Sequence, residues 1–113
     1  MKLAIPLARG IVAPRLEQGE QFDIVEVDCV ERRILSAGRA DPISLDPPDL
    51  ARWLASERID LLLLGELTAS QRHLFEGCGI KVVEGAPPGA PHDVVKGYLR
   101  DEICDEVVVD ATD

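Results

Sequence analysis

The stretch from Ile59 to Val83, IDLLLLGELTASQRHLFEGCGIKVV, decides the fold class. It opens with an apolar run of strand length, as expected for a strand that is covered on both faces. Thr68 and Gln71 then have the Thr-x-x-Gln spacing of a capping box, which predicts a helix ending at Gly77. Ile80–Val83 predicts a further strand. A strand, a helix and a strand in succession predict parallel neighbouring strands with a right-handed crossover.

Three apolar runs before this stretch predict more strands. They are Leu3–Leu7, Phe22–Val27 and Val30–Ser36, and the last two read as an antiparallel hairpin with a tight turn near Asp28. Residues 36–46 carry turn residues without periodicity, which predicts a connector.

Two further helices complete the expected elements. Asp46 suits the N-cap of the first, and Leu50, Trp53 and Leu54 form one apolar stripe along it. Pro91 opens the last. Together, the elements predict a three-layer α/β/α domain with a mixed five-stranded sheet. We assign residues 1–103 to this single domain and residues 104–113 to an acidic C-terminal tail, which is either frayed or an extra edge strand.

Charge and hydropathy exclude several classes of partner. The chain has 113 residues, with 12 Lys and Arg against 21 Asp and Glu, for a formal net charge of −9. This balance opposes binding to nucleic acid or to an anionic membrane. No apolar run reaches membrane-spanning length, and the first ten residues, broken by Pro6 and Arg9, do not fit a signal peptide. We therefore expect a cytoplasmic protein; its oligomeric state is left open.

The cysteines and histidines give no recognisable metal site. Cys29, Cys78 and Cys104 are scattered without a CxxC pair, and His73 and His92 are isolated in the sequence. We expect Cys78 to be a buried core residue and the other two cysteines to be incidental free thiols. The identity of any metal ligands is left unknown.

Catalytic motifs are absent from the sequence. The first predicted strand carries no acid of the kind a two-metal nuclease needs, and neither a Gly-x-Ser-x-Gly elbow nor a P-loop occurs. We therefore expect the protein not to be an enzyme, and a small-metabolite enzyme is the least favoured alternative.

Four segments, taken in order and spacing, resemble one known family. They are MKLAIPL (residues 1–7), VAPRLEQGEQFDIVEVD (12–28), IDLLLLGELTASQRHLFEGCGIKVVEGA (59–86) and GYLRDEI (97–103). The sequence is similar to the dinitrogenase iron–molybdenum cofactor biosynthesis family, which includes nitrogenase accessory proteins that carry metal–sulfur cofactors. The resemblance implies a ribonuclease-H-like fold. It also implies that a cluster docks near the loop after the first strand.

Two departures from this family bear on function. Arg15 stands where many members have a histidine, and Glu66 follows Gly65 where a Gly-Gly turn is common. Two hypotheses stay open. The first is a carrier for an iron–molybdenum or other metal–sulfur cluster, or a related anion, with cluster donor or acceptor proteins as partners. The second is a divergent member that has lost cluster binding and acts as a protein-interaction or regulatory module.

The candidate binding mouth combines two connections that are remote in sequence. The loop after the first strand and the turn at residues 65–68 both follow carboxyl ends of predicted strands, where α/β sheets bind ligands, and a helix N-terminus there favours an anion. The candidate residues are Arg9, Pro14, Arg15, Gly65, Glu66 and Thr68. The alternative is that both arginines pair with the carboxylates of Glu17, Glu20 or Glu66 on a solvated loop.

Overall fold

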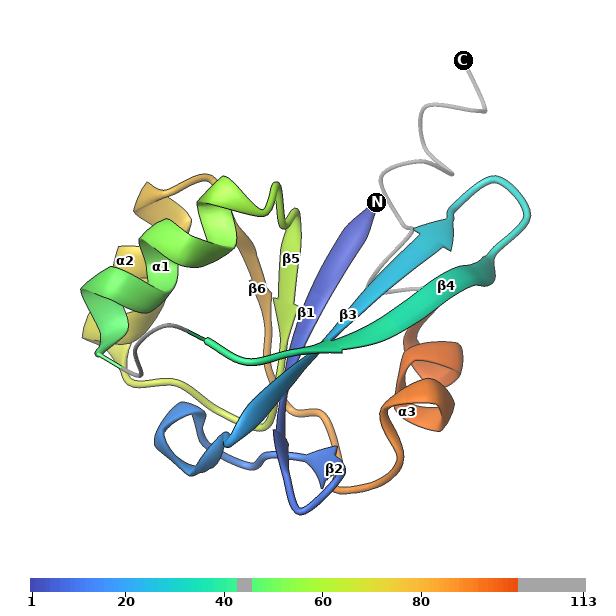
Figure 1. The fold of residues 1–113 in the computed structure, drawn as a ribbon, viewed down its shortest axis with the longest axis horizontal. Coiled ribbons are helices and arrows are strands. Elements are labelled where there is room, and N and C mark those ends of the chain that lie inside the picture. The colour runs from blue at the N-terminus through green and yellow to red at the C-terminus, as the bar shows by residue number, and fades with distance from the viewer. Residues whose placement is uncertain (43–45, 100–113) are drawn as a thin grey trace.

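The structure, a computed structural model, describes residues 1–42 and 46–99 (Figure 1). Its elements are β1 (Lys2–Ala8), β2 (Ile11–Val12), the 3-10 helix η1 (Leu16–Gln18), β3 (Gln21–Asp28), β4 (Arg33–Ala40), α1 (Pro47–Ser56), β5 (Leu61–Leu63), α2 (Ala69–Gly77), β6 (Lys81–Val83) and α3 (Pro91–Tyr98). The predicted tail, residues 104–113, lies outside the described residues, as do Cys104 and the predicted domain end at residue 103.

The strands form one mixed sheet. Its order is β4-β3-β1-β5-β6, with β2 pairing β1 away from this path. β5 runs parallel to β1 and β6, whereas β3 runs antiparallel to β1 and β4. The sheet therefore has six strands and not the predicted five. The extra strand, β2, has two residues and folds back on the end of β1, so it is too short to leave a periodic pattern in the sequence.

The predicted second strand of the hairpin, Val30–Ser36, begins and ends too early in the sequence. β4 covers Arg33–Ala40, so it starts after the predicted residue 30 and continues through residues assigned to a connector. Its pairing with β3 runs from Asp28 opposite Arg33 to Phe22 opposite Ala40. Most side chains of β4 are exposed. Backbone pairing with β3 therefore holds this strand in place. Because neither of its faces is buried, its sequence does not show the alternation of apolar and polar residues that marks a half-buried strand.

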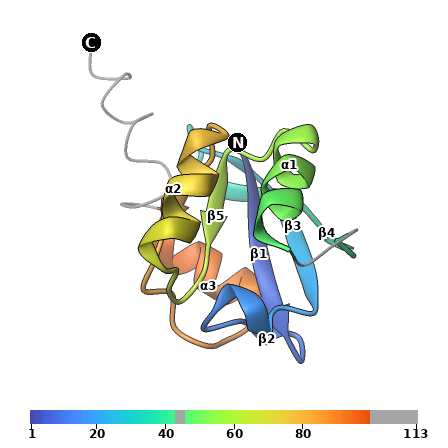
Figure 2. The same ribbon diagram turned by 90° about the vertical axis from the view of Figure 1, so that its left-hand side faces the viewer.

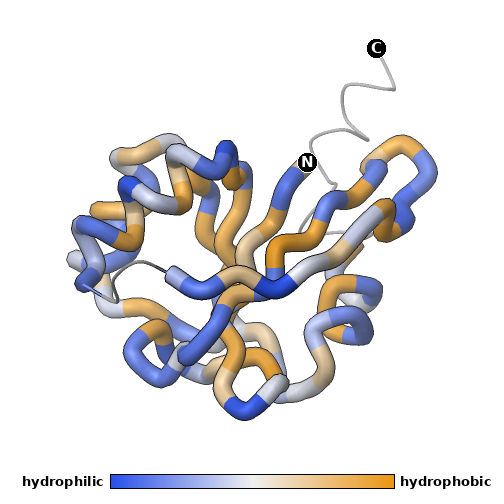
Figure 3. The backbone as a smooth tube through the Cα atoms, viewed as in Figure 1, coloured by the Kyte–Doolittle hydropathy of each residue, from blue (hydrophilic) through white to orange (hydrophobic). Residues whose placement is uncertain are grey.

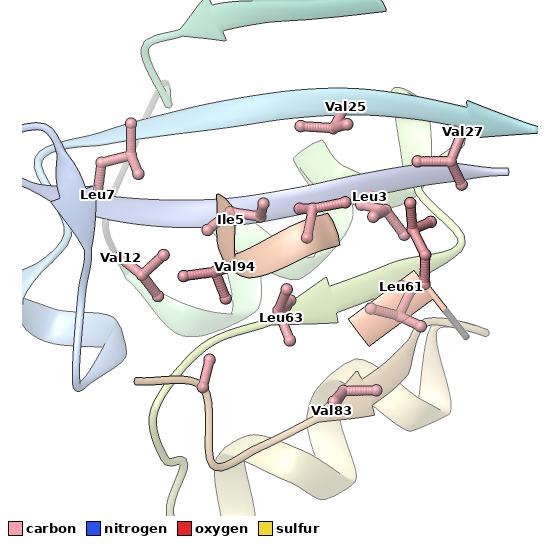
Figure 4. Close-up of a cluster of buried hydrophobic side chains, with 13 residues drawn as sticks. Leu3, Ile5, Leu7, Val12, Val25, Val27, Leu61, Leu63, Val83 and Val94 are labelled. Carbon is pink, nitrogen blue, oxygen red and sulfur yellow. The ribbon is translucent and has the colours of Figure 1, made fainter. Parts of the chain in front are cut away.

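Helices cover both faces of the sheet, as Figures 1 and 2 show from two sides. One buried cluster joins the sheet to α3 and includes Leu3, Ile5, Val25, Leu63 and Val94 (Figure 4). The other joins the sheet to α1 and α2 and includes Ala4, Phe22, Leu54, Leu62 and Phe75. The predicted three-layer α/β/α arrangement is thus confirmed.

Hydropathy follows these layers. The central strands carry many of the apolar residues, whereas apolar and hydrophilic residues alternate along the helices (Figure 3). β5 has no exposed residue at all, which agrees with a strand covered on both faces. Within the described residues, no helix is both long and apolar enough to cross a membrane.

One carboxylate lies in the interior. Asp23 of β3 is 6% exposed, and the Nε of Arg39 on the neighbouring strand lies 3.9 Å from its Oδ1. Burial raises the pKa of the Asp23 carboxyl above its ordinary value of 3.8, and the charges of Arg39 and His92 partly offset this rise.

The raised pKa of Asp23 makes stability depend on pH. The folded chain holds this proton more tightly than the unfolded chain, so the contribution of Asp23 to stability is fully present below pH 3.8 and is lost as pH rises through the folded-state pKa. Asp23→Asn should therefore gain stability relative to the wild type as pH rises through this window. Urea midpoints measured from pH 3 to pH 8 test this. Glu26→Gln, an exposed position on the same strand, is the matched control; equal pH profiles for the wild type and Asp23→Asn would contradict the prediction.

Candidate functional site

The two connections predicted to form a binding mouth do meet. The backbone N–H of Gly65 donates to the carbonyl of Ala13 at 3.3 Å, and that of Glu66 donates to the carbonyl of Pro14 at 2.8 Å. Arg15 and Glu66 form a parallel β-bridge. The segment after β2 is therefore fixed by backbone hydrogen bonds against the turn that follows β5.

Gly65 is required by this junction itself. A Cβ at this position would lie 2.3 Å from the carbonyl oxygen of Pro14 and 2.7 Å from its Cα. Real Cβ atoms essentially never approach backbone this closely. The glycine thus admits the backbone of the protein's own chain at this point.

The side chains of the bridged residues also pair. The Nε of Arg15 donates to the Oε1 of Glu66 at 3.0 Å, and each side chain is 60% exposed. This is the alternative that the sequence left open for Arg15. An ion pair this exposed contributes about 0–1 kcal/mol to stability, so it separates readily.

A small cavity opens between these residues and the start of α2. Its volume is about 240 Å³, and it is lined by Arg15, Glu17, Glu66, Leu67, Thr68 and Gln71. The predicted capping box of α2 is present, because the Thr68 Oγ1 accepts from the Gln71 N–H and the Gln71 Oε1 accepts from the Thr68 N–H. The box engages two donors at the helix start. Among the residues that line the cavity, Arg15 is positively charged, and Glu17 and Glu66 are negatively charged.

Arg9 lies apart from this cavity. It sits in the turn between β1 and β2 with φ of 56°, and its backbone N–H donates to the Oε1 of Glu20 at 3.0 Å. Arg9 does not line the cavity that Arg15 and Glu66 line. Of the six candidate residues, the structure thus brings Pro14, Arg15, Gly65, Glu66 and Thr68 together.

A second cavity adjoins the first along α2. Its volume is about 410 Å³, and its lining residues are Leu67, Ala69, Arg72, His73, Glu76 and Glu84. Arg72 and Glu84 form an ion pair across it. Glu84 was not among the residues predicted from the sequence, although it directly follows β6 and therefore stands at the same carboxyl edge of the sheet as Gly65.

The cysteines differ from their predicted roles. Cys78 is exposed at the C-cap of α2, so its prediction as a core residue was wrong. Helix α2 ends just before it and turns its buried side to the sheet through Phe75. Cys29 is partly buried and disulfide-bonded, which corrects its prediction as a free thiol.

No metal-ligand cluster is visible in the part of the chain that the structure describes. Residues 1–42 and 46–99 hold no group of three or more His, Cys, Asp and Glu side chains that could bind a metal ion. His73 lines the larger cavity, and His92 lies near enough to Asp23 for its charge to act on that carboxyl.

Comparison with known proteins yields structural likeness alone. No protein family matches the chain, and no curated protein does. The orange protein of Desulfovibrio gigas, solved in its apo form, is 21% identical with a TM-score of 0.69, and the match covers 89% of this chain and 88% of that one. This chain therefore has the same fold as the orange protein. The protein PH0822 is 21% identical with a TM-score of 0.75, over 88% of this chain and 90% of that one.

A third solved structure extends this likeness. It belongs to a protein of Methanocaldococcus jannaschii described as a proposed dinitrogenase, at 16% identity and a TM-score of 0.70, with 90% of each chain covered. At such identities the likeness establishes the fold and leaves the chemistry of the site to its own residues.

Proposed function

We propose that this chain is a non-enzymatic binding or carrier protein for an anionic metal–sulfur cluster, of the iron–molybdenum type or related to it. The observation that carries the proposal is the junction of residues 13–15 with residues 65–66, which positions Arg15 over a cavity at the start of α2. The names of two structural neighbours, the orange protein and the proposed dinitrogenase, support it. The strand order, with β3 antiparallel to both its neighbours, also supports the ribonuclease-H-like fold.

The cavity lining carries one cation, Arg15, and two carboxylates, Glu17 and Glu66, so an anion binds there through Arg15 and must displace Glu66 from it. Described residues near the cavity offer no set of metal ligands, whereas the guanidinium of Arg15 supplies charge-assisted hydrogen-bond donors to oxygen or sulfur atoms of an anion. The positive end of the α2 dipole adds to this attraction. A multiply charged anion competes with Glu66 for Arg15, because their exposed pairing is weak. Proteins that donate or accept the cluster would be the partners.

Titration with tetrathiomolybdate tests the site. We expect the wild type to bind it with a shift of its visible absorption, and Arg15→Ala to weaken binding at least fivefold. Glu66→Gln should strengthen binding about fivefold, because it removes a competing charge worth up to about 1 kcal/mol. Isothermal titration calorimetry at low ionic strength measures each dissociation constant.

Arg9→Ala is the matched control for this series. It removes the same charge from a residue that does not line the cavity, so binding should change less than twofold. Equal affinities for Arg15→Ala and the wild type would overturn the site assignment. Equal losses in Arg9→Ala and Arg15→Ala would indicate a nonspecific charge effect.

The ion pair of Arg15 with Glu66 also favours the second hypothesis. In that case the pair closes a mouth that no longer takes a cluster, and the chain acts as a protein-interaction or regulatory module. Absence of tetrathiomolybdate binding by both the wild type and Glu66→Gln, together with recovery of a stable protein partner free of metal, would establish this alternative.

A further inference from the structure

A third cavity lies between the turn that joins β3 to β4 and the end of α3. Its volume is about 490 Å³, and it is lined by Glu31, Arg32, Lys96 and Leu99. Lys96 belongs to the last turn of α3, and Leu99 is the C-cap of this helix. In Figure 1 the β3–β4 turn and the start of α2 are on opposite sides of the molecule. This cavity is therefore separate from the one that Arg15 lines.

Two cations without a carboxylate partner line this third cavity. Among the residues that the structure describes, neither the Arg32 nor the Lys96 side chain forms a hydrogen bond or an ion pair. The carboxylate of Glu31 is itself paired, because its Oε2 lies 3.4 Å from the Nε of Arg33. The lining thus presents two unpaired positive charges, although the whole chain has a formal net charge of −9.

Arg32 is in an unfavourable position without a ligand. This residue is only partly exposed, and its φ is 56°, in the left-handed region that a residue with a Cβ rarely occupies. Partial burial of a guanidinium removes water from it, and no protein group replaces the lost hydrogen bonds. Strained backbone of this kind is found where a chain is held around a ligand. An anion in the cavity would supply the missing hydrogen bonds.

The turn that carries Arg32 is fixed in advance. The Oδ1 of Asp28 accepts from the N–H of Val30 at 2.9 Å and from the N–H of Glu31 at 3.2 Å. The pairing of β3 with β4 begins directly beside the turn, with Asp28 opposite Arg33. Arg32 therefore has little backbone freedom to lose when a ligand binds, and this preorganisation favours affinity.

The lining is suited to a dianion that is attached to a small organic group. A guanidinium donates two parallel hydrogen bonds to a phosphate, and an ammonium adds a compact positive charge. Two unpaired cations balance the two negative charges of a phosphate monoester. The volume of about 490 Å³ lies in the usual range of small-molecule sites, and Leu99 adds an apolar side chain to the lining.

We propose that this cavity binds a phosphate monoester of a small organic molecule through Arg32 and Lys96. The guanidinium and the ammonium donate hydrogen bonds to the phosphate oxygens, and the organic group lies against Leu99. The site does not depend on the proposed binding of a metal–sulfur cluster at α2.

Phenyl phosphate, a dianion at pH 8, tests the site in the full chain at low ionic strength. In a ¹H–¹⁵N NMR titration it should shift the amide signals of residues 29–33 and 95–99. Arg32→Gln and Lys96→Gln should each weaken binding about tenfold, because each removes a charge-assisted hydrogen bond. Inorganic phosphate should shift the same signals but bind more weakly, because it lacks the organic group. Shifts confined to residues 65–71, or equal affinities for the wild type and both variants, would overturn the proposal.

Arg32→Gly separates the binding role of this residue from a role in folding. Glycine adopts a φ of 56° readily, so this variant should unfold in urea at a midpoint no lower than that of the wild type. It should nevertheless bind phenyl phosphate about tenfold more weakly. Retention of wild-type affinity in this folded variant would overturn the assignment of Arg32.

Arg58→Gln is the matched control for Arg32→Gln. Arg58 also has a left-handed φ, of 61°, but it does not line the cavity. The affinity for phenyl phosphate should therefore change less than about twofold, since an exposed charge far from the site is screened. Equal losses in Arg58→Gln and Arg32→Gln would mean that phosphate responds to net charge alone, which would overturn the site.

Discussion

Gly65→Ala is expected to lower the free energy of unfolding by about 3 kcal/mol, at the upper end of the cost of inserting a methyl group into a packed site. The new Cβ would meet the carbonyl oxygen of Pro14 at 2.3 Å. Pro14 cannot withdraw without loss, because the same carbonyl accepts the Glu66 N–H. Urea denaturation followed by circular dichroism measures the change.

Gly97→Ala is the matched control for Gly65→Ala. Gly97 lies within α3, and a Cβ there would have no neighbour within 4 Å, so alanine should stabilise the chain by about 0.5–1 kcal/mol. The two substitutions add the same atom and should have opposite signs. A Gly65→Ala chain as stable as the wild type would contradict the close backbone approach at Pro14.

The role of Gly65 shows that the sequence pattern does not identify which group packs against a glycine. A glycine after a buried strand indicates that something approaches the backbone, but the pattern does not identify what approaches. The approaching group is Pro14, 51 positions earlier in the chain. The pairing of Arg15 with Glu66 depends on the same junction. Sequence reasoning predicted that the two connections meet, but not that they fill part of the space between them.

The central fold was predictable because burial and capping both act locally. The apolar run of β5, the capping box at Thr68 and the stripe on α1 each leave a pattern within a few residues, and the structure contains all three elements. β4 and the exposed Cys78 were not predictable in this way. An edge strand depends on its partner's backbone, and a residue just past a helix end has no periodic position that fixes its burial.

Leu62→Ala and Leu63→Ala are each expected to cost about 3 kcal/mol of folding free energy, the usual range for truncating a fully buried leucine. These neighbours in β5 point to opposite faces of the sheet. Leu62 belongs to the cluster under α1 and α2, and Leu63 to the cluster under α3. Both are fully buried. Urea denaturation measures both changes in free energy.

The comparison between these two variants tests the layer arrangement itself. Val30→Ala, at an exposed turn position, should change stability by less than about 0.5 kcal/mol and controls for truncation as such. If only one face of the sheet were covered, one of the two leucines would behave like Val30. A small effect of Leu63→Ala beside a large effect of Leu62→Ala would mean that α3 does not pack against the sheet, and that the chain has two layers and not three.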